Sequence, residues 1–246
     1  MKRLKLALLV AGLMMSLPPA LSHATPTLQL YIEGSVYDSS DQSWVIDASD
    51  FTLWVLGNVS SDGTIFDVKL SAAYATSEAG AGSSISISPT QAALGILPAP
   101  GDPSPSAALS PDSSGDGNAP LLGNGTPLPS HGVFGPGTSW ESWALGDFTL
   151  TDSPIGDFTN GGCPDGPACE YPSMGQINAY NISITGYSSV HFDAFDHIGA
   201  ENHFKYRKAP FSHDAVAVPE PGALSLTLLG SGLLGAWALR KTAFKR

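Results

Sequence analysis

The sequence predicts an all-β domain over residues 25–217, an antiparallel β-sandwich of jelly-roll-like type. Three observations support this prediction. Apolar and polar residues alternate with a period of two in many short runs, as expected of half-buried strands. Residues that favour turns separate these runs. No run in this region carries the apolar stripe of 3.6-residue period that a packed helix requires.

The first half of the domain supplies five expected strands. Alternation predicts them at residues 28–33, 44–46, 51–56, 65–74 and 84–88. The run at 51–56 is rich in aromatic and β-branched residues, which favour strands. Short turns containing Asp, Ser and Gly separate the runs, so antiparallel hairpins are the simplest connections between them.

Residues 95–130 interrupt this pattern. They contain eight of the twenty prolines, together with many Gly, Ser and Ala residues. Such a composition predicts a long irregular surface segment. Within it, residues 112–118 present Asp, Ser and Asn oxygens around a glycine turn, in the manner of a calcium-binding loop. The EF-hand spacing and its final Glu are missing, and a solvated loop is the alternative interpretation.

Alternation resumes in the second half of the domain. Further runs lie at residues 147–150, 155–159, 176–185 and 188–192. We expect the last two to pair as a hairpin across Gly186 and Tyr187. A change of phase near Asn181 predicts a β-bulge at that position. The complete domain is expected to contain about eight to ten strands in a sandwich.

The N-terminus has the features of a secretory signal peptide. Three basic residues precede an apolar stretch at 6–17, and small residues follow at the minus-three and minus-one positions of a cleavage site. We predict cleavage after Ala24, so that residues 1–24 form the signal peptide. The mature chain is then exported and begins at Thr25.

The C-terminus, residues 218–246, predicts a membrane-spanning segment. Residues 222–239 contain no charged side chain, and a basic stretch begins at Arg240. Eighteen helical residues rise roughly 27 Å, near the lower limit for crossing a hydrocarbon core of about 30 Å. A single transmembrane helix at 222–239, with its basic end in the cytoplasm, is therefore expected. A buried C-terminal helix is the alternative, but the run offers few polar residues for an outer face.

The charge balance of the exported domain excludes one class of partner. Four basic and twenty-one acidic residues leave residues 25–217 with a net charge of −17. Nucleic-acid binding requires basic patches that neutralise phosphates, so we expect no nucleic-acid partner. About 190 residues are enough to bury a single sizeable core.

Cys163 and Cys169 are the two cysteines of the chain. They lie across a short turn rich in Pro and Gly, and in an oxidising compartment such a pair is expected to form a disulfide. A metal or redox role is the alternative. It fits less well, because a redox pair has two intervening residues and a zinc site needs two further ligands.

Two further groups of residues suggest binding chemistry. Between positions 191 and 214 the chain gathers His191, Asp193, Asp196, His197, Glu201, His203, His213 and Asp214. Imidazole and carboxylate groups are ligands of zinc and similar ions, although these polar residues could instead satisfy loop backbone groups. Trp140 and Trp143, with Trp44 and Trp54, could stack against sugars on a lectin-like surface, or could be core packing.

We find no catalytic motif, and we expect a protein that is not an enzyme. The nucleophile elbow GxSxG, a phosphate-binding loop and the dinucleotide glycine fingerprint are all absent from the sequence. The many carboxylates would permit a glycosidase pair, but the sequence singles out none.

The C-terminus resembles the PEP-CTERM sorting signal of Gram-negative bacteria. The resemblance rests on Pro219, Glu220 and Pro221, on the glycine-punctuated apolar run at 228–235, and on the basic end at Arg240. It implies that the membrane enzyme exosortase recognises the Pro-Glu-Pro motif, cleaves near it, and passes the protein to the cell surface or the exopolysaccharide matrix. The inner membrane would hold the precursor until then.

The exported domain resembles the choice-of-anchor N family of surface proteins. The similarity lies in residues 28–34, 134–140, 190–193 and 209–215. The family has no activity to carry over, so the resemblance supports architecture and location. It also suggests that His191, Asp193, His213 and Asp214 belong to one shared feature, and these four are our candidate metal ligands, with calcium or another divalent ion as the candidate cofactor.

Together these observations predict a non-enzymatic surface or matrix protein associated with exopolysaccharide and biofilm. A cell-surface carbohydrate-binding module is the first alternative. A metal-dependent hydrolase built on the His and Asp residues near the C-terminus is the second.

Overall fold

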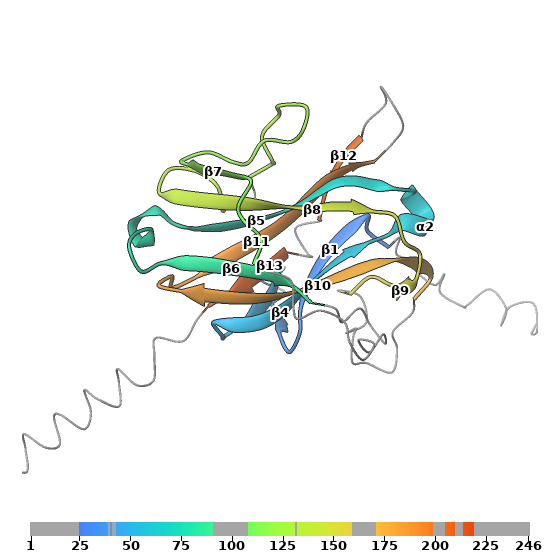
Figure 1. Ribbon diagram of the computed structural model, residues 1–246, viewed down its shortest axis with the longest axis horizontal. Helices are drawn as coiled ribbons and strands as arrows, with labels where there is room; N and C mark the ends of the chain where they lie inside the picture. Colours follow the sequence, from blue (N-terminus) through green and yellow to red (C-terminus); the bar gives the residue numbers. More distant parts are fainter. Residues whose placement is uncertain are drawn as a thin grey trace, which may run out of the picture.

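Two β-sheets enclose a common core in the structure, a computed structural model (Figure 1). It describes residues 25–38, 40, 43–90, 108–130, 132–158, 171–198, 205–209 and 214–218. Strands account for 57% of the described residues and helices for 5%, which confirms the predicted all-β class.

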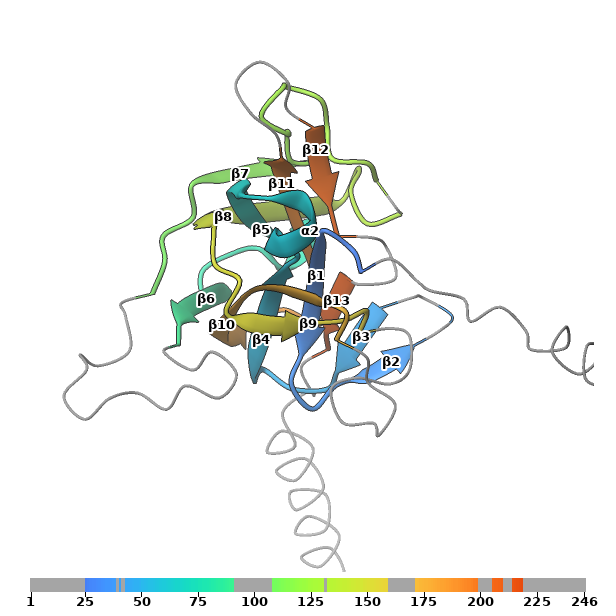
Figure 2. The same cartoon turned by 90° about the vertical axis from the view of Figure 1, so that its right-hand side faces the viewer.

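The smaller sheet has five strands, and all of its pairs are antiparallel. Its path runs β1-β4-β10-β6, and β9 pairs with the beginning of β10 (Figure 2). The strands are β1 (Leu28–Ile32), β4 (Asp50–Gly57), β6 (Ser84–Pro89), β9 (Ser153–Ile155) and β10 (Ser173–Thr185).

The larger sheet has eight strands along the path β2-β3-β13-β11-β5-β8-β7, with β12 paired to β11. The two long central strands, β5 and β11, carry most of the residues discussed below. The strands are β2 (Val36–Asp38), β3 (Ser43–Ile46), β5 (Ile65–Ala75), β7 (Ser113–Asp116), β8 (Thr138–Phe148), β11 (Val190–Ile198), β12 (Lys205–Lys208) and β13 (Asp214–Ala217).

One strand pair departs from the predicted antiparallel sandwich. β13 runs parallel to β3, with Ala215 opposite Trp44 and Val216 opposite Val45. A parallel pair requires a long connection rather than a tight turn, and β13 lies far from β3 in the sequence. The two sheets, of five and eight strands, also contain more strands than the eight to ten that we expected.

The core between the sheets follows from the period-two alternation of the strands. Inward residues of the smaller sheet include Leu30, Leu53 and Ile182, and those of the larger sheet include Leu70 and Phe192. All five are buried. Two short helical turns, α2 (Val59–Asp62) and η1 (Thr76–Glu78), connect strands at the margin, and Val59 of α2 joins the core.

The hairpin expected between residues 176–185 and 188–192 is wrong. β10 pairs with β4, β6 and β9, whereas β11 pairs with β5, β12 and β13. The chain therefore crosses from one sheet to the other at Gly186, which has a φ of +76°. The apolar residues of β10 and β11 enter the same core from opposite sides, because the two strands lie in different sheets of the sandwich.

The β-bulge expected near Asn181 is also wrong. β10 keeps a continuous register against β4 and β6 through this residue. The change of phase has another cause: the first half of β10 buries odd-numbered residues such as Ile177, whereas the second half buries even-numbered residues such as Ile182 on the opposite face. Ile177 points away from the main core and packs with Phe158 and Ile155 in a separate cluster.

Part of the segment expected to be an irregular surface loop is ordered. Residues 113–116 form β7, and Leu121 pairs with Pro127 in an isolated bridge. Leu128 and Phe134 pack on Ala73, Trp140 and Phe195. We call residues 117–130 and 132–137 the roof segment, because they cover part of the outer face of the larger sheet.

Several predictions lie outside the described residues. These are the signal peptide at 1–24, the pair Cys163 and Cys169, the motif Pro219, Glu220 and Pro221, and the helix at 222–239. In the part of the chain that the structure describes, no helix has the length and apolar character needed to cross a bilayer.

Candidate functional site

A pocket of about 310 Å³ lies on the outer face of the larger sheet, beside the roof segment. Four parts of the chain form it: β5, β11, β12 and the part of the roof segment around Leu121 and Gly123. Its lining residues are Asp67, Lys69, Leu121, Gly123, Phe195, Asp196, His197 and Tyr206. We call it the β5–β11 pocket.

The pocket exists because the β5 ladder is interrupted at Asp67. The register of β5 with β11 shifts between Phe195 and His197, and its register with β8 shifts on either side of Val68. Asp67 has a φ of +50° and is the single non-glycine residue with positive φ among the described residues. Its backbone N–H donates to Asp147 Oδ1 at 2.9 Å. Backbone strain of this kind concentrates at functional sites.

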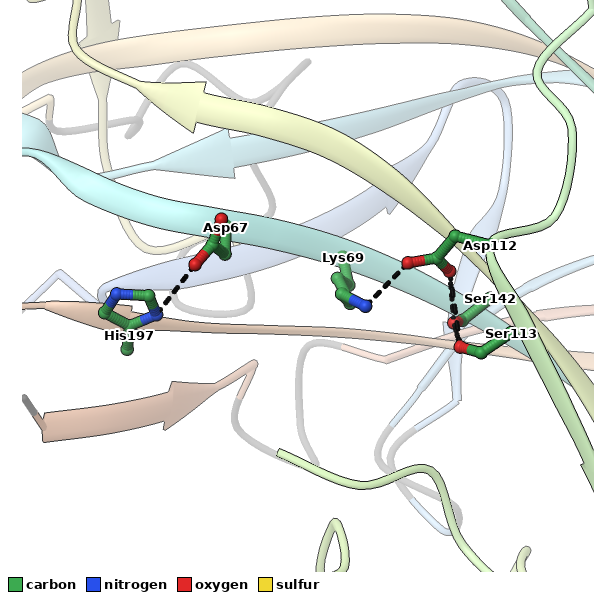
Figure 3. Close-up of polar contacts among 6 residues, drawn as sticks. All are labelled: Asp67, Lys69, Asp112, Ser113, Ser142 and His197. Atoms are coloured by element: carbon green, nitrogen blue, oxygen red, sulfur yellow. Dashed lines mark hydrogen bonds and ion pairs between the residues drawn. The ribbon is translucent and has the colours of Figure 1, made fainter. Parts of the chain in front are cut away.

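The bulge turns the Asp67 carboxylate toward His197 on the neighbouring strand. His197 Nδ1 lies 3.6 Å from Asp67 Oδ2, and the Asp67 side chain is 75% exposed (Figure 3). The imidazole stacks on Phe66 at a centroid distance of 5.6 Å and an interplanar angle of 18°. The ring of Tyr206 lies 5.6 Å away on β12. Two aromatic contacts therefore hold the imidazole, while Asp67 keeps a solvent-facing carboxylate.

Lys69 forms the second polar pair of the pocket. Its Nζ lies 2.6 Å from Asp112 Oδ2, and the same carboxylate accepts a hydrogen bond from Ser142 Oγ at 2.9 Å. Ser113 Oγ lies 2.7 Å from Ser142 Oγ, which extends this network to β7 (Figure 3). Burial raises the pKa of Asp112, but hydrogen bonds from Lys69 and Ser142 and the Lys69 charge outweigh it, so the pKa is lowered.

Asp196 also lines the pocket, between Phe195 and His197 on β11, but its carboxylate is buried. It is 3% exposed, and neither of its carboxylate oxygens has a hydrogen bond of good geometry within the described residues. Burial raises the pKa of Asp196 to about 7, against the opposing charge of Arg207; the charge of Asp62 raises it further. The Arg207 N–H, on the paired strand, lies close enough to lower this pKa slightly.

The candidate metal ligands are brought together only in part. His191 Nε2 lies 3.6 Å from Asp193 Oδ2, and both residues belong to β11. Asp214 begins β13, the strand that pairs with β11, and His213 lies outside the described residues. Among the described residues, no group of three His, Cys, Asp or Glu side chains could hold a metal ion. The metal site stays a prediction.

The calcium-loop interpretation of residues 112–118 is wrong. This stretch contains β7, an extended strand paired with β8. At about 3.3 Å per strand residue, Asp112 and Asp116 are too far apart to share an ion. Their oxygens bind the protein instead: Asp116 accepts hydrogen bonds from Thr76 and Ser139.

Trp140 and Trp143 cannot form the expected sugar-stacking surface, because both are buried. Trp140 is 6% exposed, and Trp143 is fully buried in the core between the sheets. Gly115 packs so closely on the Trp140 indole that a side chain there would overlap it. Trp140 Nε1 donates to Asn118 Oδ1 at 3.2 Å. Both indoles are packing residues.

Sequence reasoning did not bring together the residues that line the pocket. Asp67 and Lys69 lie in the strand predicted at residues 65–74 but were not singled out, and neither was Tyr206. His197 belonged to the His and Asp group but had no assigned partner. The alternation of apolar and polar residues does not reveal the bulge in β5, and without the bulge Asp67 would not be expected beside His197.

Comparison with known proteins identifies the C-terminus alone. Residues 217–241 match the PEP-CTERM protein-sorting motif. The motif marks an exported protein directed to the cell surface, with exosortase as its processing partner. A search of curated proteins found no significant match. The resemblance of the exported domain to the choice-of-anchor N family has no support from these comparisons.

Several solved structures show a distant likeness to the chain. AvmM, described as catalysing macrocyclization in alchivemycin A biosynthesis, is 9% identical, with a TM-score of 0.33, over 80% of this chain and 92% of its own. The C-terminal domain of BspA, an AgI/II polypeptide of Streptococcus agalactiae, is 8% identical, with a TM-score of 0.24, over 78% of this chain and 50% of its own. Likenesses this weak carry no argument.

Proposed function

We propose that the β-sandwich is a non-catalytic component of the extracellular polysaccharide or biofilm matrix. The observation that carries this proposal is the PEP-CTERM motif at residues 217–241, which begins at the last residue of β13. In this proposal the signal peptide exports the chain of a Gram-negative bacterium and the helix at 222–239 holds it in the inner membrane. Exosortase then cleaves near Pro219, Glu220 and Pro221.

The composition of the domain supports a place in a hydrated polysaccharide rather than on nucleic acid. The net charge of residues 25–217 is −17, which favours solubility and repels polyanions such as nucleic acids. Non-catalytic function is supported by the absence of a nucleophile or cofactor motif from the sequence. The metal-dependent hydrolase gains no support from the described residues, since none of their side chains form a three-ligand group.

Fractionation of the native host tests the proposal. Cells with and without exosortase are separated into membrane, medium and extracellular-matrix fractions, and the intact mass of the protein is measured in each. We expect the matrix fraction of the parent strain to contain a chain that starts at Thr25 and lacks the C-terminal helix. Without exosortase the protein should stay in the membrane at full mature length. A protein found only in the medium, free of polysaccharide, would contradict the matrix role.

A further inference from the structure

The β5–β11 pocket has the size of a site for one small ring-shaped ligand. Its volume of about 310 Å³ is near the lower end of the range for small-molecule sites. Leu121, which is 61% exposed, and the exposed Asp67 side chain lie on its wall. The pocket therefore opens to solvent, and a ligand ring inside it can belong to a longer chain outside.

The charges around the pocket favour a neutral ligand. Lys69 is paired with Asp112 at 2.6 Å, and His197 lies 3.6 Å from Asp67. An anionic ligand would have to compete with these carboxylates, and the net charge of the domain would repel it. A neutral ligand with several hydroxyl groups can instead add hydrogen bonds to the exposed carboxylate without breaking either pair.

The walls of the pocket provide apolar surface beside these polar groups. Phe195 is buried at the sheet, Leu121 is exposed at the loop, and the partly buried ring of Tyr206 lies on β12. Gly123 lies against Tyr206, where an added Cβ would be 3.1 Å from the ring and its hydroxyl. Aromatic rings with a few fixed polar groups are the usual composition of a small-molecule site, and the apolar face of a sugar ring matches it.

We propose that the β5–β11 pocket binds a single neutral sugar unit of the matrix polysaccharide. Asp67 accepts hydrogen bonds from the sugar hydroxyls, and Tyr206 packs against the ring. The bulge fixes the backbone of Asp67 before the ligand arrives, which lowers the entropic cost of binding. This inference rests on the matrix function proposed above and assigns it to a particular site.

Binding to fractionated host polysaccharide tests this assignment. The deproteinised polysaccharide is separated by anion exchange into neutral and acidic fractions, each is immobilised, and binding of the mature chain purified from the host is measured. Asp67→Gly removes the carboxylate, and glycine adopts positive φ without strain. Tyr206→Ala removes the ring. We expect wild type to prefer the neutral fraction and each variant to bind about tenfold more weakly or worse.

Asp50→Asn is the matched control, because it also removes one exposed carboxylate. Asp50 lies in a second surface depression on the smaller sheet, together with Asn181 and Ser183. The affinity of the Asp50→Asn variant for the polysaccharide should stay within about twofold of wild type, a smaller change than the loss of one hydrogen bond causes. Circular dichroism and thermal unfolding confirm that each variant is folded. If Tyr206→Ala is unstable, Asp67→Gly decides the question alone.

The outcomes separate the pocket from the matrix function. The assignment is overturned if wild type prefers the acidic fraction, binds neither fraction, or binds as well after Asp67→Gly. It is also overturned if Asp50→Asn causes the loss, since the sugar would then lie on the smaller sheet. A wild-type protein that is found in the matrix while Asp67→Gly binds equally well would disprove the pocket alone. Absence of wild type from the matrix would disprove the function.

Discussion

At the residue scale, the environment of Asp196 links the stability of the domain to pH. Its pKa is about 7 in the folded protein, against an ordinary value of 3.8. Between these two values the folded state retains a proton that the unfolded state has lost. The unfolded state then binds fewer protons, so stability falls as pH rises through this window. Below about pH 4 both states are protonated, and above about pH 7 the loss is complete.

Asp196→Asn should therefore stabilise the protein more at high pH than at low pH. The amide keeps the shape of the protonated carboxyl but cannot ionise. The gain should be small near pH 4 and should grow to at most about 4 kcal/mol by pH 8, following the size of the pKa shift. Urea unfolding of wild type and variant at pH 4, 6 and 8 measures it.

Asp47→Asn provides the control for this experiment. Asp47 is exposed between β3 and β4, so its replacement should change stability by less than about 0.5 kcal/mol at every pH. An equal effect of Asp196→Asn at pH 4 and pH 8 would mean that Asp196 does not titrate as the folded structure implies.

At the element scale, two glycines allow close packing around the pair of β10 and β4. Gln176 pairs with Gly57, and Gly175 lies directly against the Gly57 carbonyl and Ile155. A Cβ on Gly175 would overlap both groups. A Cβ on Gly57 would lie 2.6 Å from Phe148 Cδ2, inside the core between the sheets. A side chain at Gly175 would force β10 away from β4 where β9 joins the sheet, whereas a side chain at Gly57 would displace Phe148 and Ile65 of the opposite sheet.

Gly175→Ala should destabilise the protein by about 1–3 kcal/mol or more, because backbone atoms must move to admit the methyl group. The change in urea midpoint at constant m-value measures this loss. Gly80→Ala is a matched control, since a Cβ added at Gly80 would meet no heavy atom within 4 Å and the residue has no positive φ. Equal stability of the two variants would show that β10 and β4 do not approach closely.

At the scale of the whole molecule, the sandwich and the sorting motif are joined with almost no linker. β13 ends at Ala217, and the PEP-CTERM match begins at the same residue. β13 pairs with both β3 and β11, so the end of the folded domain is a strand inside the larger sheet. Processing near Pro219, Glu220 and Pro221 would therefore act close to folded structure.

Glu220→Ala should block this processing, because it removes the charged residue of the motif. In a host with exosortase we expect an unprocessed chain in the membrane fraction, measured by fractionation and intact mass. Glu33→Ala is the control: it removes an acidic residue of the β-sandwich and should leave processing unchanged. Identical processing of Glu220→Ala and wild type would exclude recognition through this residue.

Sequence patterns predicted the class of fold but only part of its topology. The strands at residues 65–74 and 84–88 were found almost to the residue, because alternation reports directly which side chains are buried. β12 and β13 were missed, because neither of these short segments alternates clearly between apolar and polar residues. Sheet membership of β10 and β11 was also missed, because alternation does not identify a strand's partner.

The sequence by itself determined the all-β class and the sorting motif, because both are local. Alternation and a short linear motif are complete within a few consecutive residues. Tertiary structure alone decided which tryptophans are buried and where a pocket forms. The pocket depends on a bulge that brings Asp67 beside His197, 130 residues later in the chain, and on a roof segment that packs over the sheet. Contacts between such distant residues are set by strand register and core packing, which no local pattern encodes.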